Sequence, residues 1–352
     1  MKMPSHSWFR LDFPETIRSM ATWPLQRQAI PWLLLTVVAA GSLSVGPVSA
    51  GEGKPANTYV YKQAGELKLK LDVYLPEALG RRPVVMWIHG GALVLGDRSS
   101  PARPLLDMLL DAGFIVTSID YRLAPEVKAE TIIRDVQDAY GWIRLNGPKL
   151  FRADTDKMAV AGGSAGAYLT LTSGFRLSPR PAVLLSLYGY GEVVGDWYNQ
   201  PYEPYRQHLV SKKEAYAVLS PTPLSGTRNR NGKYRRLKFY MYCRQNGLWP
   251  LLVCGHDPEL EREAFRPLCA LWNVDKCYPP TFLIHGDKDV DVPYEQSVQM
   301  SEKLREFGVD HRLVTIAGSG HGFSDSDPEI VRKAYQQAIE FIGKYVKSPD
   351  GL

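Results

Sequence analysis

The sequence predicts an α/β fold built on a mostly parallel, doubly wound sheet. Short apolar runs, typical of strands covered on both faces, alternate along the chain with longer stretches of helical periodicity. The composition agrees with a folded chain, because 45% of the 352 residues are hydrophobic and only 22% are charged. The formal net charge of +5 is too small to indicate a nucleic-acid partner, and none is expected.

The strands and helices are expected in a definite order. Residues 58–62 and 67–75 flank a turn, and strict alternation in the second run predicts an antiparallel hairpin with one buried face. Continuous apolar runs predict buried strands at 83–88, 114–119, 158–161, 182–187, 281–284 and 312–316. Helical spacing predicts helices at 132–143, at 165–171 and, after a start at Pro328, as far as residue 345.

One long segment does not follow the alternation. Residues 192–278 separate two expected strands and exceed what a crossover helix needs, so we expect a cap-like insertion. This segment holds all four cysteines, and their confinement to it predicts up to two disulfides with three possible pairings. A zinc site is less favoured, because no Cys-x-x-Cys pair is present. The cysteines are Cys243, Cys254, Cys269 and Cys277.

The N-terminal residues 1–50 have the pattern of a secretory signal peptide. A basic flank precedes the apolar run 32–40, and small residues at 48–50 offer a cleavage site. We therefore expect a mature chain, 51–352, that is secreted or periplasmic and has no stable membrane insertion. The alternative is a membrane anchor through 29–50, because the uncharged stretch is about as long as a bilayer crossing.

The strongest chemical signal is Gly162-Gly-Ser-Ala-Gly166, which lies between an expected strand and an expected helix. Gly-x-Ser-x-Gly in that context predicts a nucleophilic serine on a sharp turn, at a helix N-terminus that stabilises developing negative charge. The alternative for Ser164 is an ordinary glycine-rich turn. The surrounding strand and helix favour the nucleophile.

A serine nucleophile needs a base and a group that orients the base. His321 is the preferred base, because it lies on a glycine-rich loop after the strand 312–316, whereas His285 and His311 are interpreted as structural. Asp289 is the preferred carboxylate. Its neighbours Asp287 and Asp291 are the alternatives, with Asp287 expected to cap the turn and Asp291 to face solvent or cap the next helix.

Backbone N–H groups are expected to bind the oxyanion of an acyl-transfer intermediate. His89-Gly-Gly-Ala92 follows the strand 83–88, where Gly90 or Gly91 would supply one donor, and Ala165 would supply the other. A third glycine would be usual, and Ala92 replaces it. His89 is interpreted as a residue that holds this loop.

These motifs resemble those of the α/β-hydrolases, in the esterase and lipase group around hormone-sensitive lipase. They are also similar to bacterial esterases that remove acetyl or feruloyl groups from polysaccharides. Residues 120–126 (Asp-Tyr-Arg-Leu-Ala-Pro-Glu) and the Asp135-x-x-x-Ala139-x-x-Trp142 pattern extend the match. The resemblance covers about 58–191 and 279–345, and it does not cover the insertion.

The motifs, the resemblance and the N-terminal pattern together predict a secreted serine hydrolase that cleaves carboxylic esters through an acyl-enzyme, with Ser164, His321 and Asp289 as its triad. The expected substrate is a small-molecule or polysaccharide-linked ester, and no metal or organic cofactor is implied. Aromatic side chains near the start of the insertion, Tyr188, Tyr190 and Trp197, are candidates for substrate binding. The alternatives are a serine peptidase of the prolyl-oligopeptidase type and a non-catalytic binding module, and the oligomeric state is left open.

Overall fold

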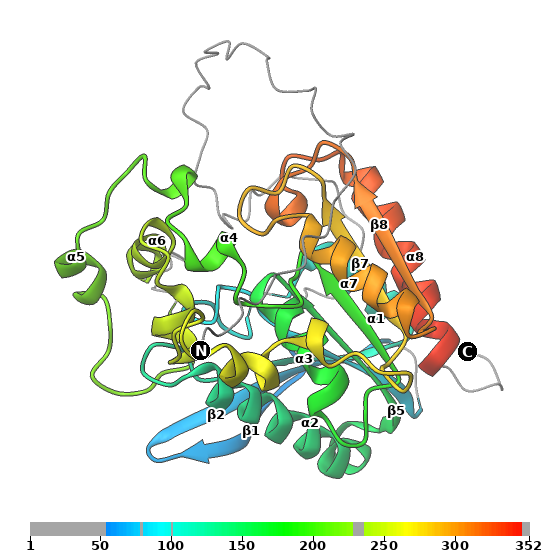
Figure 1. Ribbon diagram of the computed structural model, residues 1–352. Coiled ribbons are helices and arrows are strands. Elements are labelled where there is room, and N and C mark those ends of the chain that lie inside the picture. Colours follow the sequence, from blue (N-terminus) through cyan, green and yellow to red (C-terminus); the bar gives the residue numbers. More distant parts are fainter. Residues whose placement is uncertain (1–53, 78–79, 100, 228–235, 347–352) are drawn as a thin grey trace, which may run out of the picture. The chain divides into compact units, whose positions relative to one another are not determined.

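A computed structural model describes residues 54–77, 80–99, 101–227 and 236–346 of the chain. The predicted signal peptide at 1–50 lies outside these residues. The described strands form one eight-stranded sheet in the order β1-β2-β4-β3-β5-β6-β7-β8 (Figure 1). The strands are β1 (Asn57–Ala64), β2 (Leu67–Tyr74), β3 (Arg82–Ile88), β4 (Ile115–Ile119), β5 (Ala153–Gly163), β6 (Val183–Leu187), β7 (Thr281–Gly286) and β8 (His311–Ile316).

The strand directions confirm the predicted fold. β1 and β2, blue in Figure 1, form the antiparallel hairpin, and β2 also runs antiparallel to β4. The other neighbouring strands pair in parallel, from β4 and β3 across to β7 and β8. Parallel strands end at the same edge of a sheet, so the loops after β3, β5, β7 and β8 meet at one edge.

Helices cover both faces of the sheet. In β3 the pleat turns Val84, Met86 and Ile88 to one face and Val85 and Trp87 to the other, and all five are buried. The first face packs against α2, α3 and α7, and the second against α1 and α8. These helices are α1 (Arg103–Asp111), α2 (Ala129–Phe151), α3 (Ala165–Arg176), α7 (Glu295–Glu306) and α8 (Pro328–Val346).

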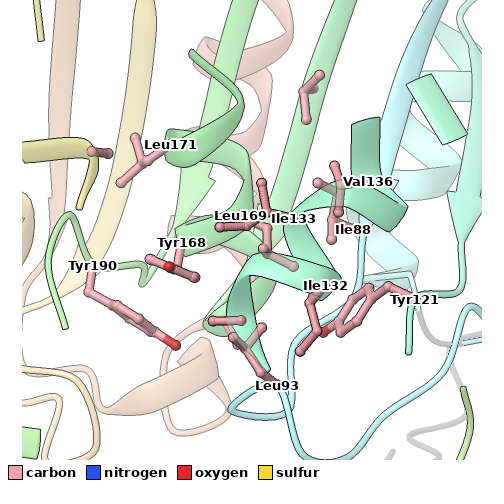
Figure 2. Packing of buried hydrophobic residues seen from close by; sticks show 14 of the residues in the cluster. Ile88, Leu93, Tyr121, Ile132, Ile133, Val136, Tyr168, Leu169, Leu171 and Tyr190 are labelled. Carbon is pink, nitrogen blue, oxygen red and sulfur yellow. The ribbon is translucent and has the colours of Figure 1, made fainter. Parts of the chain in front are cut away.

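The contact between α2 and α3 forms the centre of the larger hydrophobic core. Figure 2 shows Ile132 and Ile133 of α2 near Tyr168 and Leu169 of α3, with Ile88 of β3 in the same cluster. All five side chains are at most 2% exposed. This packing fixes α3, and therefore the residue at its N-terminus, against the sheet. No helix in the part of the chain that the structure describes is both long and apolar enough to cross a membrane.

Within the described residues, the regular elements of the insertion between β6 and β7 are short helices joined by turns and loops. Its short helices contribute many buried side chains to the core that also contains α2 and α3. They are α4 (Asp196–Asn199), η1 (Glu203–Tyr205), α5 (Lys212–Tyr216), α6 (Leu237–Gln245), η2 (Pro250–Cys254), η3 (Arg262–Leu268) and η4 (Ala270–Trp272).

The prediction of disulfides in this insertion is wrong, because the structure has all four cysteines as free thiols. Cys243, Cys254 and Cys269 are buried members of the hydrophobic core, whereas Cys277 is exposed. Free cysteine packs in a core as a small apolar side chain. Burial also raises the pKa of Cys254 well above that of an ordinary thiol, so it stays protonated.

Candidate active site

Ser164 lies at a sharp turn between β5 and α3. Its backbone has φ 55° and ψ −122°, a positive-φ conformation that is strained for any residue other than glycine. Its backbone N–H donates to the carbonyl oxygen of Leu187 at 2.9 Å, which ties the turn to the end of β6. The neighbouring strand therefore holds the strained backbone that carries the Ser164 hydroxyl.

The two flanking glycines are needed because backbone segments approach each other closely here. A Cβ at Gly162 would lie 2.4 Å from the carbonyl oxygen of Gly166. A Cβ at Gly166 would lie 2.0 Å from the carbonyl oxygen of Ile88, at the end of β3. No side chain fits at either distance, so the motif reflects the packing of α3 against β5 and β3.

The structure brings the three side chains of the predicted triad into hydrogen-bonding contact. Nε2 of His321 lies 3.0 Å from Oγ of Ser164. On the other side of the ring, Nδ1 of His321 lies 2.6 Å from Oδ2 of Asp289. The imidazole can therefore accept the serine proton at Nε2 while Nδ1–H donates to the carboxylate.

The charges around this site keep Asp289 ionised and stabilise the protonated form of His321. Burial raises the pKa of Asp289, but the charge of His321 and hydrogen bonds from His285 and His321 outweigh it, so its pKa lies below the usual value. Burial lowers the pKa of His321, but Asp289 and Asp291 raise it above the ordinary 6.5. Asp289 thus stays ionised, and a protonated His321 is stabilised.

His285 has a role that the sequence reasoning missed. The sequence favours a structural role for this histidine, yet its Nε2 lies 3.2 Å from Oδ2 of Asp289 and 3.1 Å from the carbonyl oxygen of Val292. Because both neighbours accept, Nε2 carries the hydrogen, and Nδ1 accepts from the Ser297 hydroxyl at 2.7 Å. The position of His285 four residues before Asp289, at the end of β7, is the signal that could have identified this contact.

The loop after β3 lies directly beside the serine. A Cβ at Gly90 would lie 3.2 Å from Cβ of Ser164, so the Gly90 backbone borders the nucleophile. Gly91 has φ +113° and its carbonyl oxygen accepts from two later N–H groups, which makes a tight turn. Ala165 is the first residue of α3, where N–H groups have no partner within the helix. Of the predicted oxyanion donors, Gly90 therefore borders Ser164 and Ala165 follows it directly in the chain.

Ala92 occupies the place of the third glycine and still adopts a glycine-like backbone, with φ 52°. The insertion holds this part of the loop, because Nε1 of Trp249 donates to the Ala92 carbonyl oxygen at 3.0 Å. His89 stacks on Tyr121 with ring centroids 4.1 Å apart, in agreement with its interpretation as a residue that holds the loop.

The three candidate aromatic residues lie in different environments. The Tyr188 ring packs edge to face against the His321 ring, with the ring centroids 4.9 Å apart. Tyr190 has no exposed surface and stacks on Tyr168, the packing that Figure 2 shows. Trp197 is half-buried and donates from Nε1 to Glu192 at 2.8 Å. Only Tyr188 contacts a triad residue directly.

Asp291 is not the solvent-facing residue or helix cap that the sequence indicated. Its Oδ1 accepts hydrogen bonds from the hydroxyls of Tyr205 and Tyr240 and from Nη1 of Arg244, at 2.5–2.7 Å. Its Oδ2 lies 3.7 Å from Nε2 of His321. The reason for the difference is that all three donors come from the insertion, whose fold the sequence pattern did not predict.

The other alternative carboxylate, Asp287, behaves as expected of a turn residue. It is exposed, and its Oδ1 accepts from the Gly318 N–H at 2.6 Å. Among the described residues, no group of three or more His, Cys, Asp or Glu side chains is arranged to hold a metal ion.

Comparisons with known proteins agree with this fold. A family model described as the alpha/beta hydrolase fold matches residues 85–325, well over half of the chain. The non-reducing polyketide synthase adrD of Penicillium rubens is 29% identical over 372 residues, covering 89% of this chain and 15% of that protein. The chain spans less than a fifth of the length of the first curated relatives that it matches.

Solved structures show the same fold at low sequence identity. A protein of unknown function from Staphylococcus aureus superposes with a TM-score of 0.67 at 20% identity, over 82% of this chain and 99% of that one. The propionate-bound esterase Est2 of Thermogutta terrifontis superposes with a TM-score of 0.60 at 20% identity, over 84% and 96% of the two chains. The resemblance to the group around hormone-sensitive lipase is confirmed. The chain belongs to the α/β-hydrolase fold family.

Proposed function

We propose that the protein is a serine esterase that hydrolyses carboxylic esters through an acyl-enzyme. One observation carries the proposal: Ser164, His321 and Asp289 form a continuous chain of hydrogen bonds, with 3.0 Å and 2.6 Å between the bonded atoms. A hydroxyl, an imidazole and a buried carboxylate in this order are the groups that nucleophilic acyl transfer needs.

In the first half of the reaction, Oγ of Ser164 forms a bond to the ester carbonyl carbon while its proton moves to Nε2 of His321. The carbonyl oxygen becomes an oxyanion, which the N–H groups of Ala165 and of Gly90 or Gly91 would bind. The bond to the alcohol oxygen then breaks, and Nε2 returns the proton to that oxygen. Asp289 stabilises the imidazolium that exists between the two proton transfers.

In the second half, water takes the place of the alcohol. His321 removes a proton from the water, whose oxygen bonds to the acyl carbon. The bond to Oγ breaks, and Nε2 gives its proton to Oγ of Ser164, so that the free acid leaves and the serine is restored. We propose small-molecule or polysaccharide-linked esters as substrates. The polyketide synthases among its relatives indicate no particular ester, because the chain matches so little of their length.

A single assay tests this function. Short-chain nitrophenyl esters should be cleaved, peptide anilides should not, and Ser164→Ala should lower ester turnover by about 10⁶-fold. Ser99→Ala is the matched control, because Ser99 is an exposed serine that hydrogen-bonds to Asp97 on its own loop. Cleavage of anilides instead of esters would support the peptidase alternative. Ester cleavage unchanged by Ser164→Ala would refute the site.

We also propose export of the mature chain from about Gly51. The support is the charge-free apolar run and small-residue exit in residues 1–50. N-terminal sequencing of protein recovered from the culture medium or the periplasm should begin near Gly51. A membrane-bound chain that retains Trp32 would instead support the anchor.

A further inference from the structure

Asp291 is a carboxylate beside the triad that the proposed mechanism does not use. It lies two residues after Asp289, and its backbone N–H donates to Oδ1 of Asp289 at 2.8 Å. The loop that carries the triad carboxylate therefore also fixes the backbone of Asp291. The side chain is 14% exposed, so it is not fully enclosed by protein atoms.

The insertion fixes the orientation of this carboxylate. Arg244 of α6 is 1% exposed, and its Nη1 lies 2.7 Å from Oδ1 of Asp291 and 2.9 Å from the Asp291 carbonyl oxygen. The guanidinium also lies within 4.9–5.7 Å of the centroids of five aromatic rings, namely those of Trp197, Tyr198, Tyr202, Tyr205 and Tyr240. A buried arginine needs a counter-ion, and Asp291 supplies it through Oδ1.

The second oxygen, Oδ2, is directed to the reacting atoms. It lies 3.7 Å from Nε2 of His321, the same nitrogen that lies 3.0 Å from Oγ of Ser164. At 3.7 Å Oδ2 does not accept a hydrogen bond from the ring in this geometry, so it can accept one from a ligand. Oδ1 already accepts from three donors, which leaves Oδ2 as the oxygen for that contact.

We propose that Asp291 selects the alcohol half of the ester, favouring alcohols with a second hydroxyl next to the ester oxygen and rejecting alcohols with a negative charge. This inference rests on the proposed esterase function. Nε2 of His321 must hydrogen-bond the departing alcohol oxygen, so that oxygen lies beside Oδ2 of Asp291. A hydroxyl on the adjacent carbon, as in glycols, glycerol and sugars, then comes within reach of Oδ2.

The chemistry of a carboxylate sets the direction of the preference. An ionised carboxylate only accepts hydrogen bonds, so it binds a hydroxyl donor and repels another carboxylate. A hydrogen bond to a charged group formed with the leaving alcohol is worth about a tenfold gain in kcat/KM or more. The acyl half lies on the Ser164 side of Nε2, and Asp291 makes no contact that would distinguish one acyl group from another.

Three acetate esters that differ only in the alcohol half test the proposal on the wild-type protein. They are ethylene glycol monoacetate, the same ester with its free hydroxyl methylated, and the acetate ester of glycolic acid. Methylation keeps the electron-withdrawing oxygen but removes the donor. We expect kcat/KM, divided by each ester's hydroxide-catalysed rate, to be about tenfold higher for the free hydroxyl than for the methyl ether. The glycolate ester should be the poorest substrate of the three.

Asp291→Asn makes the test specific for this side chain. Three donors surround the Oδ1 position, so the amide oxygen of the new asparagine will occupy it and the NH₂ group will replace Oδ2. An acceptor thus becomes a neutral donor at the same place. We expect the preference for the free hydroxyl to disappear, and the glycolate ester to gain about tenfold relative to the methyl ether. Asp287→Asn, on the same loop but exposed, should keep the wild-type ratios.

Ratios of kcat/KM do not depend on how much of a preparation is folded, so a partly folded Asp291→Asn protein still gives an answer. If that variant has no active fraction, the test of the proposal is the wild-type ratio of kcat/KM for the free hydroxyl to kcat/KM for the methyl ether. Equal wild-type kcat/KM values for the free hydroxyl and the methyl ether overturn the proposal, as does a preference that Asp291→Asn leaves unchanged. Either result leaves the esterase function intact, whereas failure of the wild type to cleave any ester, or rates unchanged by Ser164→Ala, refutes that function itself.

Discussion

The indole Nε1 of Trp249 donates a hydrogen bond to the carbonyl oxygen of Ala92 at 3.0 Å. Trp249 belongs to the insertion and is fully buried, whereas Ala92 lies on the same loop as Gly90, which borders Ser164. This bond joins the insertion between β6 and β7 to the segment predicted to bind the oxyanion. The insertion is thus part of what shapes the site.

We expect Trp249→Phe to lower kcat by about tenfold for a nitrophenyl ester. Phenylalanine keeps most of the stacking on Tyr198, whose ring lies 4.2 Å away, but it leaves the Ala92 carbonyl oxygen without its donor. A buried acceptor without a partner costs about 1–3 kcal/mol, and the loop can shift to relieve that cost. Steady-state kinetics and a thermal melt measure the two effects.

Trp142→Phe serves as the matched control, because Trp142 lies on α2 and packs on Tyr59 of β1, away from Ser164. It should lower the melting temperature without lowering kcat. A Trp249→Phe protein with wild-type kcat would show that the loop keeps its geometry without the indole bond.

His285→Ala should lower kcat by about tenfold with little change in KM. The substitution removes the hydrogen bond from Nε2 to Oδ2 of Asp289, which leaves that oxygen with only His321. Losing one hydrogen bond to a charged group costs about 1.5–3 kcal/mol, part of which acts on the position of the imidazole. His285→Gln keeps an N–H donor on a side chain of similar reach and should recover part of the activity. Equal losses in both variants would indicate a packing role alone.

The regular part of the fold could be predicted because its signals are local. A run such as 83–88 is apolar at every position because both faces of β3 are covered, and Gly162 and Gly166 are glycines because backbone atoms lie too close for a Cβ. The order of Ser164, Asp289 and His321 along the chain follows from the order of the strands that precede them. Each of these inferences needs only the residues themselves and the direction of the sheet.

The rest depends on contacts that no local pattern contains. The sequence around Asp291 predicts a solvent-facing residue, because nothing in it shows that Arg244, 47 positions earlier in the chain, lies beside the carboxylate. Buried free cysteines and cysteines that form disulfides can have the same spacing, so Cys243 and Cys254 were assigned to the wrong class. Helix α1 was not among the predicted elements; the structure has proline in its first turn, where a helix tolerates it.

The acid limb of the kcat/KM profile should lie above pH 6.5. Activity needs neutral His321, and burial, which lowers its pKa, is outweighed by the negative charges of Asp289 and Asp291. Lowering the pH through this raised pKa protonates Nε2 and removes the base, so the rate falls on the acid side. Asp291→Asn removes one of the two negative charges while Arg244 stays, so its acid limb should move to lower pH.

Measurement of kcat/KM between pH 4.5 and 9 with a neutral nitrophenyl ester, for the wild type and for Asp291→Asn, tests the direction in which the acid limb moves. Tyr188, which also faces the ring, contributes no charge in that range, because burial, followed by the charge of Asp289, raises its pKa to about 12. Asp287→Asn should leave the limb in place. An acid limb that moves to higher pH in Asp291→Asn would contradict the assigned role of that carboxylate.

Gly166→Ala should destabilise the protein by about 3 kcal/mol and remove most of its activity. The new Cβ would lie 2.0 Å from the Ile88 carbonyl oxygen and 2.7 Å from that of His89, and both are backbone atoms that cannot rotate away. To make room, α3 must move away from β3, and Ser164 at its N-terminus moves with it. Chemical denaturation gives the stability, and active-site titration gives the fraction of serine that still reacts.

Gly141→Ala is the opposite case and tests whether the close approach, not the loss of a glycine as such, causes the damage. Gly141 is exposed within α2, and a Cβ there would meet no atom within 4 Å. Alanine is favoured over glycine in a helix interior by about 1 kcal/mol, so the free energy of unfolding should rise by that amount while kcat stays the same. If both variants lost stability, the backbone of α2 at Gly141 would have to differ from a regular helix. If neither variant lost stability, α3 would have to lie farther from β3 than the 2.0 Å between a Gly166 Cβ and the Ile88 carbonyl oxygen indicates.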